Sequence, residues 1–354
     1  MRIGRRCFTR AAIALSLALF PSLTGCAKSQ VVAGTSTVVG TGTDTTTMIS
    51  LGTNTTVVPP PDAGSKPQTV ECEGGTDCVC PPFNVAVIGK PGKWGANQGG
   101  DPDTALQEWL AGSSLGTAKV TNVTKRAALT ADWLAGFNVI ILASLSEDST
   151  NGPWWTFTDA EAAAFRAWVE NGGGVITLTG YSSSVDEATA ANQLIGFSGV
   201  QYNKDDVYAS CPDWGICTCT KSLILSAWNK ADSAIANLSN NITYIGFEHG
   251  RSITAPADAH VAATIDTTDG IKNVLVGKVV NGKGHVLAFG DEWITYTSQW
   301  TGAGNPMAAD PGCAGKLPQD KYQTAQFWFN MIKWSSPGAA CFKIVDTTTP
   351  VKIW

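Results

Sequence analysis

Two adjacent carboxylates are the first candidates for chemistry in this sequence. Asp291 and Glu292 stand directly after the apolar run His285–Phe289. Such a pair could act as general acid and base, or help to hold a metal ion. Neighbouring residues at a strand end point in different directions, so we expect at most one of them to enter a site. Asp291 would then cap a turn or accept backbone hydrogen bonds.

His249 and Ser182 are the other two residues that could take part in catalysis. His249 lies in Phe247-Glu-His-Gly-Arg251 after an apolar run, where it could transfer a proton or simply hydrogen-bond its neighbours. Ser182 lies in the turn Gly180-Tyr-Ser-Ser183, where its hydroxyl could be a nucleophile or the cap of a following helix.

Several tryptophans fall in segments that the sequence predicts to be loops. Flat indoles in exposed loops can stack on sugar faces at little cost in conformational entropy. Trp94, Trp155, Tyr181 and Trp293 therefore form a candidate ligand-binding rim, and Trp300 lies in a further loop. A glycan or peptidoglycan is the hypothesised ligand. The alternative is that these rings pack beneath long loops.

Short apolar strands must position these residues. The runs Asn84–Ile88, Val139–Ala143, Val175–Thr179 and His285–Phe289 are continuously apolar or nearly so, which is typical of parallel strands covered on both faces. Ligands of open parallel sheets bind outside the carboxyl ends of the strands. The loops that begin at Gly89, Ser144, Gly180 and Gly290 should therefore converge on one rim.

Helices are expected between these strands. The clearest begins after Thr158, because Thr158-Asp-Ala-Glu161 is a capping box, and Gly172-Gly-Gly174 ends it. Others are expected at 104–110, 131–134, 188–195 and 322–334. The alternation predicts an α/β fold with a mainly parallel sheet flanked by helices, interrupted by a Cys-rich insertion at about 204–221.

The strand Val139–Ala143, the capped helix, Gly172–Thr179, Gly282–Asp291 and Phe327–Trp334 together resemble the class I glutamine amidotransferase-like superfamily. They are most similar to its ThuA-like and other non-amidotransferase branches. The resemblance implies a flavodoxin-like sheet over most of 83–334. The resemblance indicates the fold of the chain and not its activity.

The family's glutaminases use a Cys nucleophile in the turn after the strand that matches Val175–Thr179, and a later His-x-Glu completes their triad. The turn here reads Gly180-Tyr-Ser-Ser183, and the chain contains no His-x-Glu. Thioester chemistry requires the thiolate, so glutaminase activity is not expected. The sequence favours a binding protein over an enzyme and implies no cofactor.

The first 25 residues read as a lipoprotein signal peptide. A basic start with Arg5-Arg6 and an apolar run at 11–20 predict a signal peptide, and Leu23-Thr-Gly-Cys26 resembles the lipobox of bacterial lipoproteins. The resemblance implies cleavage before Cys26 and lipidation of its sulfur; the alternative is an ordinary signal peptide with a chance Cys. Arg5-Arg6 fits either twin-arginine or ordinary export. Ala27 favours sorting to the outer membrane, so we expect an envelope protein whose partner is the membrane, through its lipid.

Composition divides the rest of the chain. Residues 26–71 are rich in Thr, Ser, Gly and Pro and predict a tether, 72–342 form the α/β domain, and 343–354 are a tail. Nine cysteines remain after processing, and Cys26 would carry the lipid. The other eight are an even number that suits disulfides in an oxidising compartment, and no His lies near them to suggest zinc. They are Cys72, Cys78, Cys80, Cys211, Cys217, Cys219, Cys313 and Cys341.

Charge excludes nucleic acid as a partner. Removal of 1–25 takes away four arginines and no acidic residue, so the net charge changes from −5 to −9. We therefore expect a lipid-anchored envelope protein that binds a glycan or peptidoglycan. The alternatives are a hydrolase of sugar or amide bonds that uses Asp291 or Glu292 with His249, and a structural or assembly lipoprotein.

Overall fold

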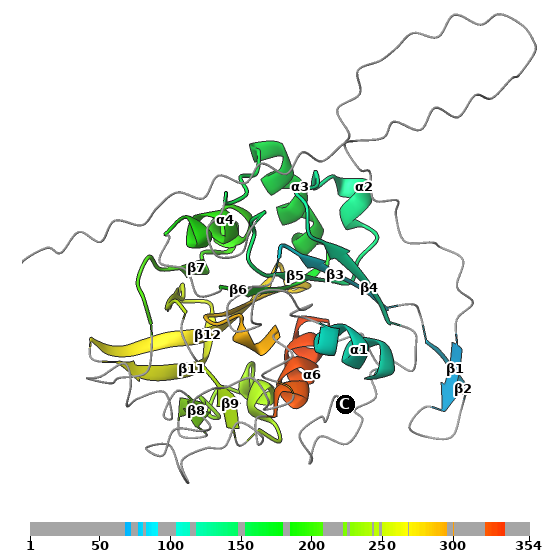
Figure 1. Ribbon diagram of the computed structural model, residues 1–354. Coiled ribbons are helices and arrows are strands. Elements are labelled where there is room, and N and C mark those ends of the chain that lie inside the picture. The colour runs from blue at the N-terminus through cyan, green and yellow to red at the C-terminus, as the bar shows by residue number, and fades with distance from the viewer. Residues whose placement is uncertain are drawn as a thin grey trace, which may run out of the picture. The chain divides into compact units, whose positions relative to one another are not determined.

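A seven-stranded sheet forms the centre of the structure, a computed structural model, in the order β11-β12-β13-β6-β5-β3-β4 (Figure 1). The structure describes residues 68–71, 77–80, 83–90, 104–113, 118–147, 153–179, 185–207, 222–224, 227–242, 244–247, 250–267, 269–295, 300 and 323–336. All of them belong to the unit Asn54–Trp354.

Five neighbouring strands of this sheet are parallel, and two more are added at one edge by antiparallel pairing. The α/β fold with a mainly parallel sheet is therefore confirmed. The seven strands are β3 (Phe83–Ile88), β4 (Ala118–Val123), β5 (Val139–Leu142), β6 (Gly174–Leu178), β11 (His260–Thr267), β12 (Gly270–Val280) and β13 (Gly284–Phe289).

A short connection explains the antiparallel pairing of β12 with β13. Only residues 281–283 join β12 to β13, and Asn281 and Gly282 have φ values of 49° and 69°. An Asn-Gly pair with positive φ is typical of a tight hairpin, whereas a parallel crossover needs a dozen or more residues. The sequence therefore contains a signal for this hairpin.

Helices cover both faces of the sheet (Figure 1). Alternate residues of each strand point to opposite faces, so Val139 and Ile141 of β5 join one core while Ile140 and Leu142 join the other. α1 and α6 contribute to the first core, and α2, α3 and α4 to the second. Their bounds are α1 (Thr104–Ser113), α2 (Ala131–Leu134), α3 (Asp159–Glu170), α4 (Asp186–Ile195) and α6 (Thr324–Ser335).

Shorter elements surround these layers. The 3-10 helices within the described residues are η1 (Gly196–Ser198), η4 (Ala236–Ser239) and η5 (Trp293–Thr295). Three two-stranded sheets pair β1 (Gln68–Glu71) with β2 (Asp77–Cys80), β7 (Gln201–Tyr202) with β10 (Ile253–Thr254), and β8 (Ser222–Ile224) with β9 (Tyr244–Gly246). β1 lies at the end of the segment that we expected to be a tether.

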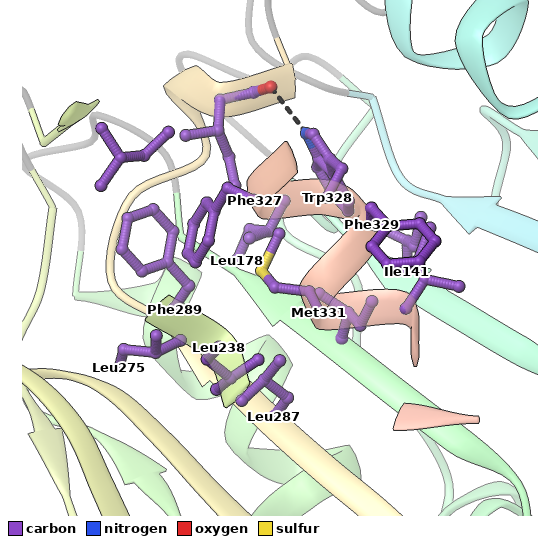
Figure 2. Close-up of a cluster of buried hydrophobic side chains, with 14 of the residues drawn as sticks. Ile141, Leu178, Leu238, Leu275, Leu287, Phe289, Phe327, Trp328, Phe329 and Met331 are labelled. Carbon is purple, nitrogen blue, oxygen red and sulfur yellow. Dashed lines mark hydrogen bonds between the residues drawn. The ribbon is translucent and has the colours of Figure 1, made fainter. Parts of the chain in front are cut away.

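Helix α6 carries the aromatic centre of the first core. Figure 2 shows Phe327 and Met331 among Leu178, Leu287 and Phe289 of the sheet. The rings of Phe289 and Phe327 meet edge to face at 5.2 Å, a favoured arrangement. Among the residues that the structure describes, no helix is long and apolar enough to span a membrane.

The capping box of α3 is confirmed. Thr158 Oγ1 accepts a hydrogen bond from the backbone N–H of Glu161, and the Glu161 carboxylate accepts one from that of Thr158. The same carboxylate also accepts hydrogen bonds from Arg126 Nη2 and from the backbone N–H of Leu129. Burial raises its pKa, but these hydrogen bonds and the Arg126 charge outweigh burial and lower the pKa to about 2.

Glu161→Gln should destabilise the protein in a pH-dependent way. Because the folded pKa lies below the ordinary 4.5, the charged form stabilises the fold above pH 4.5, and this contribution is lost as the pH falls toward about 2. We expect a loss of about 1–3 kcal/mol near neutral pH, which shrinks through that window. Urea unfolding of both proteins at several pH values measures it.

Glu170→Gln is the matched control, because Glu170 forms an exposed pair with Arg166 on the same helix. Such pairs contribute less than about 1 kcal/mol. A Glu161→Gln effect that does not change with pH would contradict the assigned role of the Glu161 charge.

Candidate functional site

The carboxyl ends of four strands meet at one edge of the sheet. Lys90, after β3, donates its backbone N–H to the carbonyl of Ser144, after β5, at 2.9 Å. The backbone N–H of Glu292, after β13, donates to the carbonyl of Thr179, after β6, at 2.7 Å. These described parts of the four loops therefore converge as predicted. β3 and β5 also flank the point where the strand order reverses, since β4 lies beyond β3.

A side-chain hydrogen bond joins two of these loops across β6. Ser144 Oγ donates to the Glu292 carboxylate and lies 2.8 and 2.7 Å from its two oxygens. Ser144 is 2% exposed and Glu292 is 1% exposed. A hydrogen bond between buried groups is electrostatically stronger than one in water, because water does not compete for it.

Ser144 holds an unusual backbone conformation. Its φ is 42°, in the left-handed region that a serine adopts at a cost of about 1–3 kcal/mol. Gly89 packs directly on this turn, and a Cβ built on Gly89 would overlap the carbonyl oxygens of Ala143 and Ser144. Such strain persists only where the surrounding structure fixes the residue.

The segment that carries Glu292 is held at several points. Thr179 Oγ1 donates to the carbonyl of Gly290, and Thr295 donates both its N–H and its hydroxyl to the carbonyl of Glu292, all at 2.8 Å. One residue before Thr295, the carbonyl of Ile294 accepts from the indole N–H of Trp328, which is the dashed line in Figure 2. Helix α6 thus fixes the turn that presents Glu292.

A buried ion pair lies at the same edge. Arg251 Nε is 3.4 Å from a carboxylate oxygen of Glu187, at the start of α4, and both side chains are 3% exposed. Arg251 also donates from Nη1 to the carbonyl of Asp205, and its backbone N–H donates to the carbonyl of Gly290. The pair therefore lies beside the turn that carries Asp291 and Glu292.

Tyr202 ties the ends of β6 and β13 together. Its hydroxyl lies 2.6 Å from the carbonyl of Thr177 and 3.0 Å from that of Phe289, and it can donate to either. Burial raises the pKa of this phenol far above its usual value, and the negative charges of Glu187 and Glu292 raise it further. Tyr202 therefore stays protonated and remains a donor.

We call Ser144, Glu187, Arg251, Asp291 and Glu292 the carboxyl-edge group. All five are less than 5% exposed. Three are carboxylates and one is a guanidinium, so acidic groups outnumber basic ones within it. Burying charges costs several kcal/mol each unless they find partners, so this density of buried charge marks the edge as a candidate functional site.

The predicted acidic pair lies within this group. Glu292 reaches across to Ser144, and Asp291 is completely buried. The other predicted site residues His249, Ser182, Tyr181, Trp94 and Cys26 lie outside the described residues, as does the side chain of Trp293. Pairing of His249 with a carboxylate therefore stays a prediction. So do the disulfides, since six of the eight cysteines lie outside and nothing is described of the side chains of Cys78 and Cys80.

The expectation of exposed indoles is wrong for Trp155 and Trp300. Trp155 is 5% exposed and donates its indole N–H to Glu147 at 3.1 Å. Trp300 is 2% exposed, packs on Trp109 and donates to the carbonyl of Ile294. In both residues the apolar ring is buried while its one polar atom finds an acceptor. These rings support the loops from beneath.

Sequence reasoning missed four residues at this edge: Ser144, Glu187, Arg251 and Tyr202. The partners of the Arg251–Glu187 pair are 64 residues apart, and no local pattern links them. Ser144 could have been found, since it follows an apolar strand just as Asp291 does. No group of three His, Cys, Asp or Glu within the described ranges is arranged to hold a metal ion.

Known proteins resemble this chain in the layout of the fold. No family model and no curated protein matches it. The mmIFT52 N-terminal domain has a TM-score of 0.48 at 14% identity, over 72% of this chain and 97% of that one. Cytoplasmic protein STM3548 from Salmonella typhimurium has a TM-score of 0.44 at 17% identity, over 71% of this chain and 98% of that one. A ThuA-like protein from Bacteroides uniformis has a TM-score of 0.41 at 12% identity, over 74% of this chain and 94% of that one.

Gly89→Ala tests how tightly the end of β3 holds the Ser144 turn. Gly89 and Gly172 have nearly equal φ values, 112° and 116°, but a Cβ on Gly172 meets nothing within 4 Å. Both variants carry backbone strain, and only Gly89→Ala adds overlap with Ala143 and Ser144. We expect Gly89→Ala to be less stable than Gly172→Ala by about 1–3 kcal/mol in urea unfolding. Equal losses would show that the turn moves freely.

Proposed function

We propose that this chain is a bacterial envelope lipoprotein whose α/β domain binds a polar, hydroxyl-rich ligand at the carboxyl edge of its sheet. The observation that carries the proposal is the carboxyl-edge group, in which four ionisable side chains are nearly completely buried beside a strained serine. A fold that needed only stability would do as well with apolar residues there. The four ionisable side chains lie at the carboxyl ends of the strands, where open parallel sheets bind their ligands. Because their burial costs free energy, their presence at this place supports a binding role.

The charge of the group favours one class of ligand. Carboxylates accept hydrogen bonds from hydroxyl groups, and an excess of them repels phosphates and other anions. Glycans and peptidoglycan fragments present many hydroxyls and amides, and they are abundant in the envelope. The acidic mature chain repels nucleic acid in the same way.

Calorimetric titration of the full chain with peptidoglycan fragments and oligosaccharides tests this binding. We expect saturable binding that Glu292→Gln weakens at least about tenfold, because the variant replaces a carboxylate oxygen that can accept from ligand hydroxyls with an amide N–H that cannot, although its amide oxygen can still accept from Ser144. Glu170→Gln changes a partly exposed residue on α3 and should bind like the unmodified chain. Absence of saturable binding, or equal effects of the two variants, would contradict the proposal.

The anchor is proposed from the sequence Leu23-Thr-Gly-Cys26. In bacteria that express the chain and are fed labelled palmitate, we expect the label on the protein and a loss of at least about tenfold in Cys26→Ser, which lacks the acceptor sulfur. Cys7→Ser changes a cysteine of the signal peptide and should keep the label. Equal labelling of Cys26→Ser and the unmodified chain would contradict the proposal that the protein is a lipoprotein.

A second candidate is hydrolysis of the bound ligand. The observation that favours it is the bond between Glu292 and Ser144, which sets a proton acceptor beside a hydroxyl. His249 with Asp291 or Glu292 would be another route to acid and base chemistry on a sugar or amide. Product analysis of the titrated mixtures separates binding from turnover.

A further inference from the structure

We propose that Ser144 is a nucleophile and Glu292 its general base, so that the carboxyl edge transfers acyl groups from ester-bearing ligands. The inference rests on the proposed binding at this edge and adds a covalent step to it. A serine becomes nucleophilic when a base lies within hydrogen-bond reach and is itself held in place. Ser144 Oγ lies 2.7 and 2.8 Å from the two Glu292 oxygens.

The base is oriented by its own backbone. Glu292 donates its N–H to Thr179, at the end of β6, and its carbonyl accepts two hydrogen bonds from Thr295. These bonds fix the backbone from which the Glu292 side chain reaches Ser144, and burial restricts that side chain further. Positioning of a base by a further group is the arrangement that general-base catalysis by a side chain requires.

The backbone of Ser144 supports the same role. In α/β hydrolases the nucleophilic serine is exposed on a strained turn between a strand and a helix. Ser144 shares the strained turn at a strand end, but it is 2% exposed. Ser144 directly follows Ala143 at the end of β5 and has a φ of 42°. Gly89 leaves room for that turn, since any Cβ there would overlap it.

A second serine–carboxylate pair shows what the purely structural arrangement looks like. Ser252 Oγ donates to Asp205 at 2.6 Å, but the other Asp205 oxygen accepts the backbone N–H of Ser252 itself. Lys272 Nζ also lies 3.6 Å from this carboxylate, which is about a third exposed. Asp205 thus serves as a local acceptor with a cation beside it. Ser252 is therefore a matched control for Ser144.

The proposed reaction conserves atoms and protons. Ser144 Oγ bonds to the carbonyl carbon of the ester while its proton passes to Glu292. The bond from that carbon to the alcohol oxygen breaks, and the alcohol leaves with the proton. Water then attacks the acyl-serine and gives a proton to Glu292. The acid departs, and Glu292 returns the proton to Ser144.

Diisopropyl fluorophosphate, a small reagent specific for activated serines, tests the proposal on the full chain. We expect one adduct per chain, located by peptide mass spectrometry on Ser144. Glu292→Gln should slow its formation at least about tenfold, because amide cannot accept the proton. Ser252→Ala should react like the unmodified chain.

Ser144→Gly keeps the test independent of misfolding. Glycine adopts a φ of 42° without strain, so this variant should retain the native circular dichroism spectrum and lose the adduct. An adduct on Ser182 or another serine, no adduct at all, or an unchanged rate in Glu292→Gln would overturn the inference. If calorimetry still shows binding that depends on Glu292, the proposed function survives that failure. An adduct on Ser144 without glycan binding would support acyl transfer and contradict the glycan.

Discussion

The hydrogen bond between Ser144 and Glu292 is the constraint on which the carboxyl edge depends. It joins the end of β5 to the end of β13 across β6, between residues 148 positions apart in the chain. A carboxylate buried to this degree destabilises the fold unless donors surround it. The register of three parallel strands must therefore bring the hydroxyl and the carboxylate to the same level, and a slip of one residue would separate them.

The two cores supply that register. Continuously apolar strands are pressed between α1 and α6 on one face and α2, α3 and α4 on the other, so the sheet cannot shift without opening both layers. The N–H groups of Trp328 and Trp300 both reach the carbonyl of Ile294. The aromatic packing of α6 thus extends directly to the turn that carries Glu292, and hydrophobic burial stabilises the polar site.

The strands and helices could be predicted from local sequence patterns. The site could not, because it is formed by contacts between residues far apart in the sequence. The apolar run Val139–Ala143 and the capping box at Thr158 contain their own signals, and both elements form where they were expected. The bonds from Ser144 to Glu292 and from Arg251 to Glu187 depend on how strands are ordered, which no spacing reveals. A positive φ at a serine has no sequence signature either.

Tryptophan exposure was unpredictable for a different reason. Trp155 and Trp300 stand in polar, irregular segments that look solvent-facing in the sequence. Whether an indole lies above or beneath a loop depends on where its N–H finds an acceptor, and Glu147 and Ile294 provide acceptors beneath the surface. These two indoles thus lie in the core, and the polar side chains of the carboxyl edge are the ones that could contact a ligand.

Hydrogen–deuterium exchange with and without a bound peptidoglycan fragment tests most directly whether the carboxyl edge is the site. Our account predicts slower exchange in peptides that cover residues 144–147 and 290–295. A groove of about 420 Å³ between α2 and the end of α3, lined by Phe137, Trp168 and Asn171, offers the clearest rival location. Protection confined to 131–138 and 164–173, with no change after β5 and β13, would contradict the account.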